Sequence, residues 1–405
     1  MNQVLGCGQE AAHNVSSARP RLLAVVSRFK WVHIDYLAAL EEHFDVFVAW
    51  SGEGGKRAPL AGLRAGMRGL PIGWIPDLGT AQVRARLQRV IAAFRPDLVH
   101  VMYYNHEDLT LLVREIVGGE LPIVFECRDP LTTLTGASPG HADWKLERDA
   151  ILASDRQILI SAAQRDYYES AHELDLGESS LVIPYAFRGS GAAPPSPKLS
   201  SADGRTHIAL VGTADAAPDH GRWYVEIIRR LVGLGFVVHS HFWDLSDFGV
   251  SLEPYVALAQ ELADYHHHPT ISYRRGTELS SAMSRYDLMG VFHELEAAHH
   301  NESATLAVCL PTKAVCGWFH GAIPVVCFPH YRGIVERIDE FGIGFVVESW
   351  EELGALSDDH AAIAAASERC LAVRSRFTTE RAAERIAEFV SPLHARDSTG
   401  GAVVS

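Results

Sequence analysis

The sequence has little cysteine, and its cysteines follow no spacing typical of a metal site or a disulfide framework. The six cysteines among 405 residues include no Cys-x-x-Cys pair, which argues against a zinc ribbon. No apolar run approaches the ~20 residues that span a bilayer, and the N-terminus lacks a basic start followed by an apolar core. We therefore expect a cytoplasmic protein with reduced thiols and no membrane partner.

Positive charge is also scarce. The formal net charge is −14, which gives no basic footprint for nucleic acid, so no nucleic-acid partner is expected. No strand pattern is followed by Gly-x-Gly-x-x-Gly, which argues against a nicotinamide dehydrogenase. With 47% hydrophobic and 21% charged residues, the composition is that of a globular chain, long enough for two domains.

Short apolar runs alternate with amphipathic helix patterns in two series. The first series starts with a strand at residues 21–27 and ends with one at 180–183, and the second starts with a strand at 207–212. Strands that are apolar throughout and alternate with helices predict parallel sheets covered on both faces. The fold class is therefore α/β, with two Rossmann-like domains facing across a cleft. The predicted segments are a flexible tail (1–19), a first domain (20–188), a linker (189–205), a second domain (206–375), a helix packing back on the first domain (376–392) and a second tail (393–405).

Residues 310–336, LPTKAVCGWFHGAIPVVCFPHYRGIVE, combine several local signals. The pattern predicts a helix over 313–320, with Gly321 at its C-cap, and a buried strand over 323–328. The residues that follow, from His330 to Glu336, then lie beyond the carboxyl end of a strand. An open parallel sheet usually binds its ligand at that edge.

One cluster of histidines and two single histidines stand out. His266 to His268 precede Pro269, and we expect them in a solvent-exposed loop before a strand at 270–273, because three adjacent histidines cannot all reach one metal without strain. His293 and Glu294 follow the predicted strand at 287–292, so they should face the crevice. His33, near the first helix start, could act as a base toward an acceptor.

Eight weak motifs, in order, resemble those of the family 4 glycosyltransferases of the GT-B fold. In the first half these are RPDLVHV (95–101), IVFECRDP (123–130), KLERDAILASDRQILISAAQRDYY (145–168) and VIPYAF (182–187). In the second half they are IALVGTADAAPDHGRWYVEIIRRL (208–231), ISYRRGTELSSAMSRYDLMGVF (271–292), LPTKAVCGWFHGAIPVV (310–326) and RGIVERIDEFGIGFVV (332–347). The resemblance as a whole covers roughly residues 20 to 390.

The resemblance implies transfer of a sugar from a nucleotide-diphosphate sugar that binds the second domain, with the acceptor mostly on the first. It implies no obligatory metal and no cofactor. The diphosphate needs fixed donors, which a loop at Gly212 and a lysine at Lys313 could supply. The matching glutamate of the family suggests that Glu336 accepts hydrogen bonds from the ribose.

The chain departs from the family pattern at several positions. The Glu-x7-Glu signature would fall on Val308 and Cys316, and the His-Asp pair reads Arg128-Asp129. Glu294, Glu296 and Glu302 are nearby substitutes for the missing carboxylates, and His220 and Arg222 stand where the family has phosphate-binding Arg and Lys. The predicted catalytic residues are His33, Arg128, Asp129 and Glu294. The predicted donor-binding residues are Gly212, Thr213, His220, Arg222, Arg275, Lys313, Gly333 and Glu336.

The resemblance therefore implies a glycosyltransferase (EC 2.4) that moves a sugar from a UDP- or GDP-sugar to a small soluble acceptor. Retention of configuration follows from the resemblance, and the acidic charge favours a specialised metabolite, such as an antibiotic, over a membrane lipid. A homodimer is compatible with the sequence. Two alternatives stay open: a partner or binding subunit that lost turnover, and an enzyme that forms an N- or S-glycoside or a pseudo-glycosidic bond.

Overall fold

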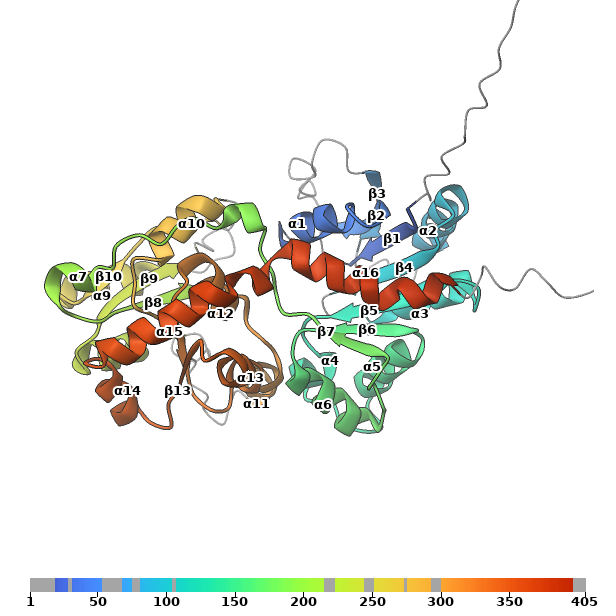
Figure 1. Cartoon of the computed structure of the whole chain (residues 1–405). Coiled ribbons are helices and arrows are strands. Elements are labelled where there is room, and N and C mark those ends of the chain that lie inside the picture. The colour runs from blue at the N-terminus through green and yellow to red at the C-terminus, as the bar shows by residue number, and fades with distance from the viewer. Residues whose placement is uncertain are drawn as a thin grey trace, which may run out of the picture.

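The computed structural model describes residues 19–27, 31–52, 68–74, 81–103, 107–214, 223–243, 251–272, 275–292 and 300–395. Two parallel sheets form the centres of two domains that lie side by side (Figure 1). The predicted α/β class with two Rossmann-like domains is confirmed.

The first sheet has seven strands in the order β3-β2-β1-β4-β5-β6-β7, all paired in parallel. All five residues of β5 and all residues of β1 except Arg21 are buried, as their apolar sequences require. The strands are β1 (Arg21–Val26), β2 (Asp45–Gly52), β3 (Arg68–Trp74), β4 (Leu98–Tyr103), β5 (Ile123–Cys127), β6 (Arg156–Leu159) and β7 (Ser180–Val182).

The second sheet has six parallel strands in the order β10-β9-β8-β11-β12-β13. One of them differs from the prediction: the strand expected at 270–273 lies earlier in the chain, at β10, which contains two of the three adjacent histidines. The strands are β8 (His207–Gly212), β9 (Val237–Phe242), β10 (Tyr265–His267), β11 (Leu288–Val291), β12 (Val325–Cys327) and β13 (Gly344–Val346).

Helices cover both faces of both sheets. In the first domain they are α1 (Trp31–Leu40), α2 (Ala81–Phe94), α3 (Asp108–Val117), α4 (Leu131–Thr135), α5 (Ala142–Leu152) and α6 (Ala162–His172). After the short turns η3 (Gly189–Gly191) and α7 (Ser200–Asp203), the second domain has α8 (Val225–Gly233), α9 (Glu253–Glu261), α10 (Gly276–Met283), α11 (His300–Val308), α12 (Thr312–Cys316), η6 (Gly317–Gly321), α13 (Arg332–Phe341), α14 (Trp350–Leu356), α15 (His360–Val373) and η7 (Arg374–Phe377).

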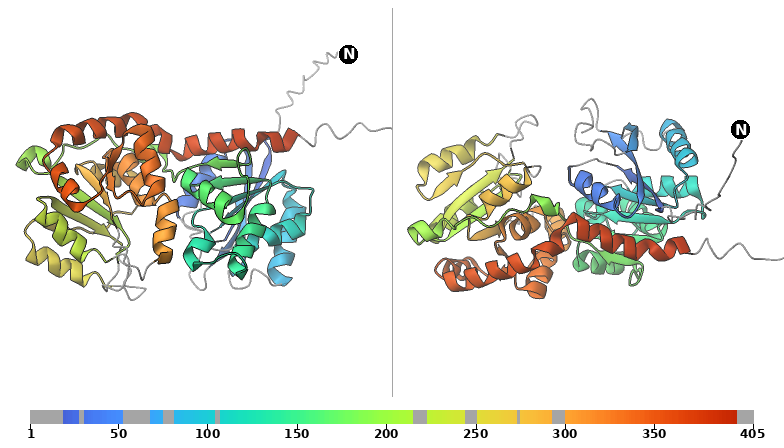
Figure 2. Two further views of the ribbon diagram at one scale, coloured as in Figure 1. Left: turned by 90° about the horizontal axis from the view of Figure 1, so that it is seen from below. Right: turned by 45° about the horizontal axis from the view of Figure 1, so that its top comes forward.

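The chain crosses between the domains twice, and the two crossings are hydrogen-bonded to each other. Phe187 N donates to Phe377 O at 2.9 Å, and Thr379 N donates to Phe187 O at 2.9 Å. The last helix, α16 (Thr379–Ala395), then lies along the first domain (Figure 2), where Ala383 and Ile386 join the core beneath α1. The two segments of chain that connect the domains therefore lie side by side.

The segment 310–336 differs in detail from the prediction. The expected helix over 313–320 is α12 followed by the π-helical turn η6, and the strand is shorter than expected, at β12. The left-handed residue after the turn is Ala322, with φ 46°, and not Gly321. A Cβ on Gly321 would lie 2.8 Å from Ile323, so this glycine serves close packing. In the part of the chain that the structure describes, no helix has the length and apolarity needed to cross a membrane.

Candidate active site

A cluster of charged and polar side chains lies buried at the carboxyl end of β5. Its centre is Glu126, which is only 1% exposed. Tyr36 Oη donates a hydrogen bond to Glu126 Oε2 at 3.0 Å, and His100 Nε2 lies 2.8 Å from the same oxygen. Arg128 forms an ion pair with the other carboxylate oxygen. A buried carboxylate is tolerated only with such partners.

The ionisation of the cluster follows from these contacts. Burial alone would raise the pKa of Glu126, but Arg128, His100 and His33 outweigh burial and hold this pKa at about 2. Burial also opposes the charge on Arg128, yet Glu126 raises the pKa of the guanidinium. Burial and the Glu126 charge raise the pKa of Tyr36. At neutral pH the cluster therefore holds an ionised Glu126, a cationic Arg128 and a neutral Tyr36.

The Arg128 guanidinium lies near two aromatic rings, and one of its nitrogens has no hydrogen-bond acceptor among the described residues. Its guanidinium lies 4.8 Å from the ring centre of Tyr185 and 6.0 Å from that of Tyr36. Arg128 Nη1 is buried, and no described residue accepts a hydrogen bond from it. A buried donor without an acceptor is costly, so an oxygen of a bound substrate would be stabilised there.

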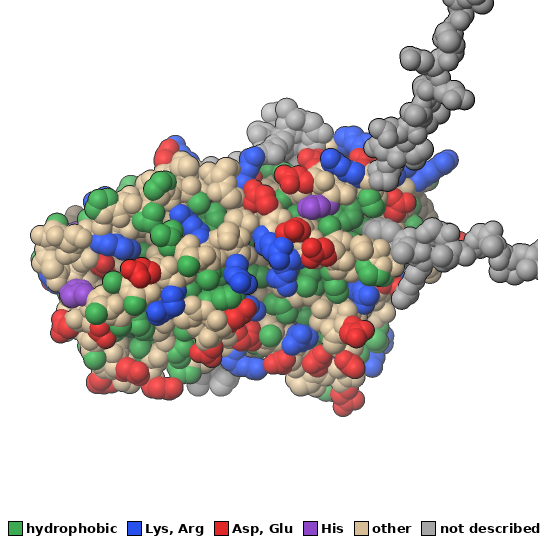
Figure 3. Space-filling model, viewed as in Figure 1, with side chains coloured by type: hydrophobic (Ala, Val, Ile, Leu, Met, Phe, Trp, Pro, Cys, Tyr) green, Lys and Arg blue, Asp and Glu red, His purple; other side chains and the backbone are tan. Residues whose placement is uncertain are grey.

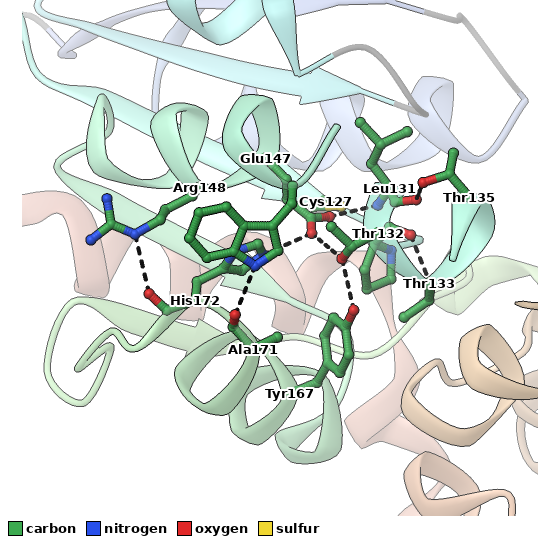
Figure 4. A network of polar contacts seen from close by, with 12 residues as sticks. Cys127, Leu131, Thr132, Thr133, Thr135, Glu147, Arg148, Tyr167, Ala171 and His172 are labelled. Atoms are coloured by element: carbon green, nitrogen blue, oxygen red, sulfur yellow. Dashed lines mark hydrogen bonds and ion pairs between the residues drawn. The ribbon is translucent and has the colours of Figure 1, made fainter. Parts of the chain in front are cut away.

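The loop that carries Arg128 and Asp129 is fixed by a second buried carboxylate, Glu147 (Figure 4). Glu147 Oε1 accepts from Leu131 N at 2.5 Å, and Glu147 Oε2 accepts from the Thr132 hydroxyl. His172 Nε2 lies 2.9 Å from Glu147 Oε2, and Tyr167 Oη lies 2.7 Å from Thr132 Oγ1. Helices α5 and α6 thus hold the first turn of α4 in place directly after the Arg128 loop.

A lysine lies near the carboxyl end of β8 in the second domain. Gly212 ends β8 with φ 126°, and a Cβ there would lie 4.0 Å from Lys313 Cδ. Lys313 Nζ donates to Tyr224 Oη at 2.9 Å, and this ammonium lies 5.6 Å from the centre of the tyrosine ring. The carboxyl ends of parallel strands form the usual ligand crevice of such a sheet, so Lys313 is positioned to bind an anion there.

The two domains touch each other beside the Arg128 loop. Cys309 Sγ donates to Arg128 O at 3.3 Å, and Thr133 Oγ1 lies 2.8 Å from Thr305 Oγ1. The segment that leads into α12 and Lys313 therefore touches the loop that carries Arg128. Glu126, with its low pKa, orients Arg128 and is a poor general base.

One family model matches part of the first domain. Residues 34–176, about a third of the chain, match the family model described as glycosyl transferase 4-like domain. The matched residues lie within the first domain. No curated protein matches the sequence.

Solved structures show that this domain belongs to a complete GT-B fold. HepE from Anabaena, solved with UDP, has a TM-score of 0.65 and 16% identity, with 92% of this chain and 100% of that chain covered. Sucrose-phosphate synthase from Thermosynechococcus elongatus has a TM-score of 0.63 and 11% identity, covering 93% and 100%. AviGT4, involved in avilamycin A biosynthesis, has a TM-score of 0.50 and 14% identity, covering 93% and 98%. The predicted GT-B fold is confirmed, and the family match supports the predicted glycosyltransferase class.

In the first domain, the structure gathers His33 and Arg128 around Glu126. His33 is 8% exposed and lies near enough to Glu126 to lower its pKa. Asp129 is half-buried on the same loop, and its backbone carbonyl accepts from Cys127 Sγ at 3.3 Å. Glu294 lies outside the described residues, as do His293 and Glu296, and only the backbone of Glu302 is described, in α11.

The predicted donor-binding residues divide into three groups. Gly212, Thr213 and Lys313 lie at or near the carboxyl end of β8. Arg275 precedes α10, where its Nη1 lies 3.1 Å from Glu278 Oε2 with both side chains mostly exposed. His220 and Arg222 lie outside the described residues.

Gly333 and Glu336 lie where the domains touch. A Cβ on Gly333 would lie 3.1 Å from Ser161 Cβ. Glu336 accepts from the backbone nitrogens of Ala162 and Ala163 at 3.0 and 2.5 Å, so it caps helix α6 of the other domain. Each carboxylate oxygen can accept a second hydrogen bond, so the expected ribose role of Glu336 stays a prediction.

The prediction that the three adjacent histidines lie in an exposed loop requires correction, and one residue of the site was not predicted. Two of the three adjacent histidines are half-buried and bonded, since His268 Nε2 lies 3.0 Å from His239 Nδ1 and His267 Nδ1 lies 2.9 Å from Ser240 Oγ. Glu126 was missing from the predicted site because its strand, IVFEC, looks uniformly buried. A single acidic residue inside a buried strand was the available signal.

Proposed function

We propose that this glycosyltransferase moves a sugar from a UDP-sugar to a small soluble acceptor, with a GDP-sugar as the alternative donor. The observation that carries the proposal is the Lys313 ammonium near Gly212 at the carboxyl end of β8. The Anabaena protein HepE, which has the same fold, was solved with UDP and with UDP and glucose, which favours a uridine nucleotide.

In this proposal the leaving diphosphate is stabilised by Lys313 and by the backbone at Gly212. Negative charge grows on the diphosphate as the glycosidic bond breaks, so a fixed cation stabilises the transition state more than the ground state. Arg128 Nη1 would hold an oxygen of the donor or acceptor, and His33 is the candidate base. Retention of configuration and a role in specialised metabolism remain proposals that rest on the family resemblance.

The test replaces the proposed phosphate contact. Lys313→Met keeps the length of the side chain and removes its charge, and we expect turnover of the preferred UDP-sugar to fall about a hundredfold. The measurement is release of nucleoside diphosphate across a panel of UDP- and GDP-sugars. Lys145→Met, which removes an exposed lysine paired with Asp149, is the matched control and should leave turnover unchanged.

A second function has its own supporting observation. Val308 and Cys316, which occupy the two positions of the family carboxylates, are 5% and 0% exposed and belong to the apolar core. Loss of both carboxylates would suit a subunit that binds nucleotide without turnover. Nucleotide binding by calorimetry, combined with no diphosphate release from any donor, would favour this function. A mass spectrum of the product would separate an O-glycoside from an N- or S-glycoside.

A further inference from the structure

A cavity lined by arginines lies where the two domains are joined, apart from the candidate active site. Its volume is about 230 Å³. The first domain contributes Val182 and Pro184, and α13 contributes Arg337. The returning chain adds Arg376 from η7 together with Arg381 and Arg385 from α16.

The cavity carries excess positive charge in a protein that is acidic overall. Four arginines line it, and Glu340 is the one carboxylate among the lining residues, whereas the whole chain has a net charge of −14. Figure 3 shows Lys and Arg side chains gathered near the middle of the molecule, over the start of α16. Such a concentration of one charge is unfavourable unless an anion offsets it.

Two of the four arginines are paired and two are available. Arg337 pairs with Glu340, and Arg381 pairs with Glu384. Among the described residues, no carboxylate lies within ion-pair distance of Arg376 or Arg385; the guanidinium of Arg376 lies over the ring of Phe341, at 5.1 Å.

Two further observations suggest that the cavity can accept an anion. Arg337 is 15% exposed, and its Nε is buried with no acceptor among the described residues. Burial and then the charges of Arg381 and Arg337 lower the pKa of Arg385, and the carboxylates of Glu340 and Glu388 offset this only in part. Guanidinium groups bind phosphate through paired hydrogen bonds, so this arrangement suits phosphate oxygens.

We propose that this cavity binds a small phosphate compound with two or more negative charges. The compound would be held by Arg376 and Arg385, with Arg337 and Arg381 at its sides. Because the lining comes from both domains and from the chain that joins them, a bound anion would also stabilise the packing of the domains against each other. The proposal is independent of the sugar donor and of the transfer reaction.

The test uses pyrophosphate as the probe and the full-length protein. We expect pyrophosphate to raise the unfolding temperature beyond the effect of sodium chloride at equal ionic strength. Calorimetry should show binding at least tenfold weaker in the Arg376→Ser/Arg385→Ser double variant. Arg229→Ser, which removes an exposed arginine paired with Glu261, is the control and should bind as the wild type does.

Two further variants keep the result interpretable. Lys313→Met removes the proposed diphosphate contact of the active site, so pyrophosphate binding that survives in this variant belongs to the arginine cavity. Arg381→Ser changes a side chain that is 50% exposed, and it provides a second test if the double variant folds poorly. Unchanged binding in both cavity variants, or no effect of pyrophosphate beyond that of salt, would overturn the proposal.

Discussion

At the scale of single residues, the site depends on one buried carboxylate that the sequence pattern does not single out. Glu126 contacts Tyr36, His100 and Arg128, and its pKa of about 2 keeps the carboxylate ionised at neutral pH. Arg128 and His33 could be predicted because they follow or precede recognisable elements. Their arrangement could not, because it depends on which side chains of β4, β5 and α1 share a face.

The Glu126→Gln variant tests this assignment. The substitution leaves a buried Arg128 without its counter-charge, so we expect the free energy of unfolding to fall by about 3 kcal/mol. Urea denaturation followed by circular dichroism measures it. Glu115→Gln removes the exposed partner of Arg84 and should change stability little. Equal stability of Glu126→Gln and wild type would show that Arg128 does not depend on this ion pair.

At the scale of elements, alternation of strands and helices predicted most of the two sheets, and the failures have local causes. Strand β3 has the sequence RGLPIGW, in which two glycines and a proline hide the strand pattern, and it is tolerated because β3 lies at the sheet edge. Strand β10 was misplaced because its histidines look like loop residues. In both cases tertiary packing outweighs the intrinsic preference of the residues.

The histidines of β8, β9 and β10 form a connected buried group. His207 Nδ1 lies 2.9 Å from His239 Nε2, and His241 Nε2 lies 2.8 Å from Tyr286 Oη. Burial, together with the charges of neighbouring histidines, lowers the pKa of His239 to about 2 and that of His241 to about 4.

This group predicts a dependence of stability on pH. The folded pKa values lie below the ordinary value of about 6.5, so the unfolded chain binds more protons in acid. The stabilisation is present above about pH 6.5 and is lost as the pH falls toward 4, at up to about 1.4 kcal/mol per pH unit for each histidine. His239→Gln should flatten the profile of unfolding free energy between pH 7 and 5, whereas the control His43→Gln in the first domain should not. A profile as steep in His239→Gln as in wild type would exclude this group as the cause.

At the scale of the whole molecule, two domains meet through specific polar contacts. The resemblance to a two-domain family predicted their arrangement, but the contacts could not be read from the chain because they join residues more than 140 positions apart. Glu336 is an example. Its sequence context suggested a ligand contact, and in the structure its carboxylate accepts hydrogen bonds from the N-terminus of α6.

Glu336→Ala tests whether this contact holds the domains together. Removing a helix cap costs about 1 kcal/mol, and we expect faster hydrogen exchange at the amides of Ala162 and Ala163. Mass spectrometry of peptides from α6 measures the exchange. Asp339→Ala, on the exposed side of α13, is the matched variant and should leave α6 protected. Normal protection of α6 in Glu336→Ala would argue that other contacts suffice.

The most direct test of the central claim is a pair of crystals soaked in parallel with UDP and with GDP. The account predicts bound UDP with its diphosphate against Lys313 Nζ and the backbone at Gly212, near Arg128. A nucleotide bound elsewhere, or no bound nucleotide in either crystal at millimolar concentration, would contradict it.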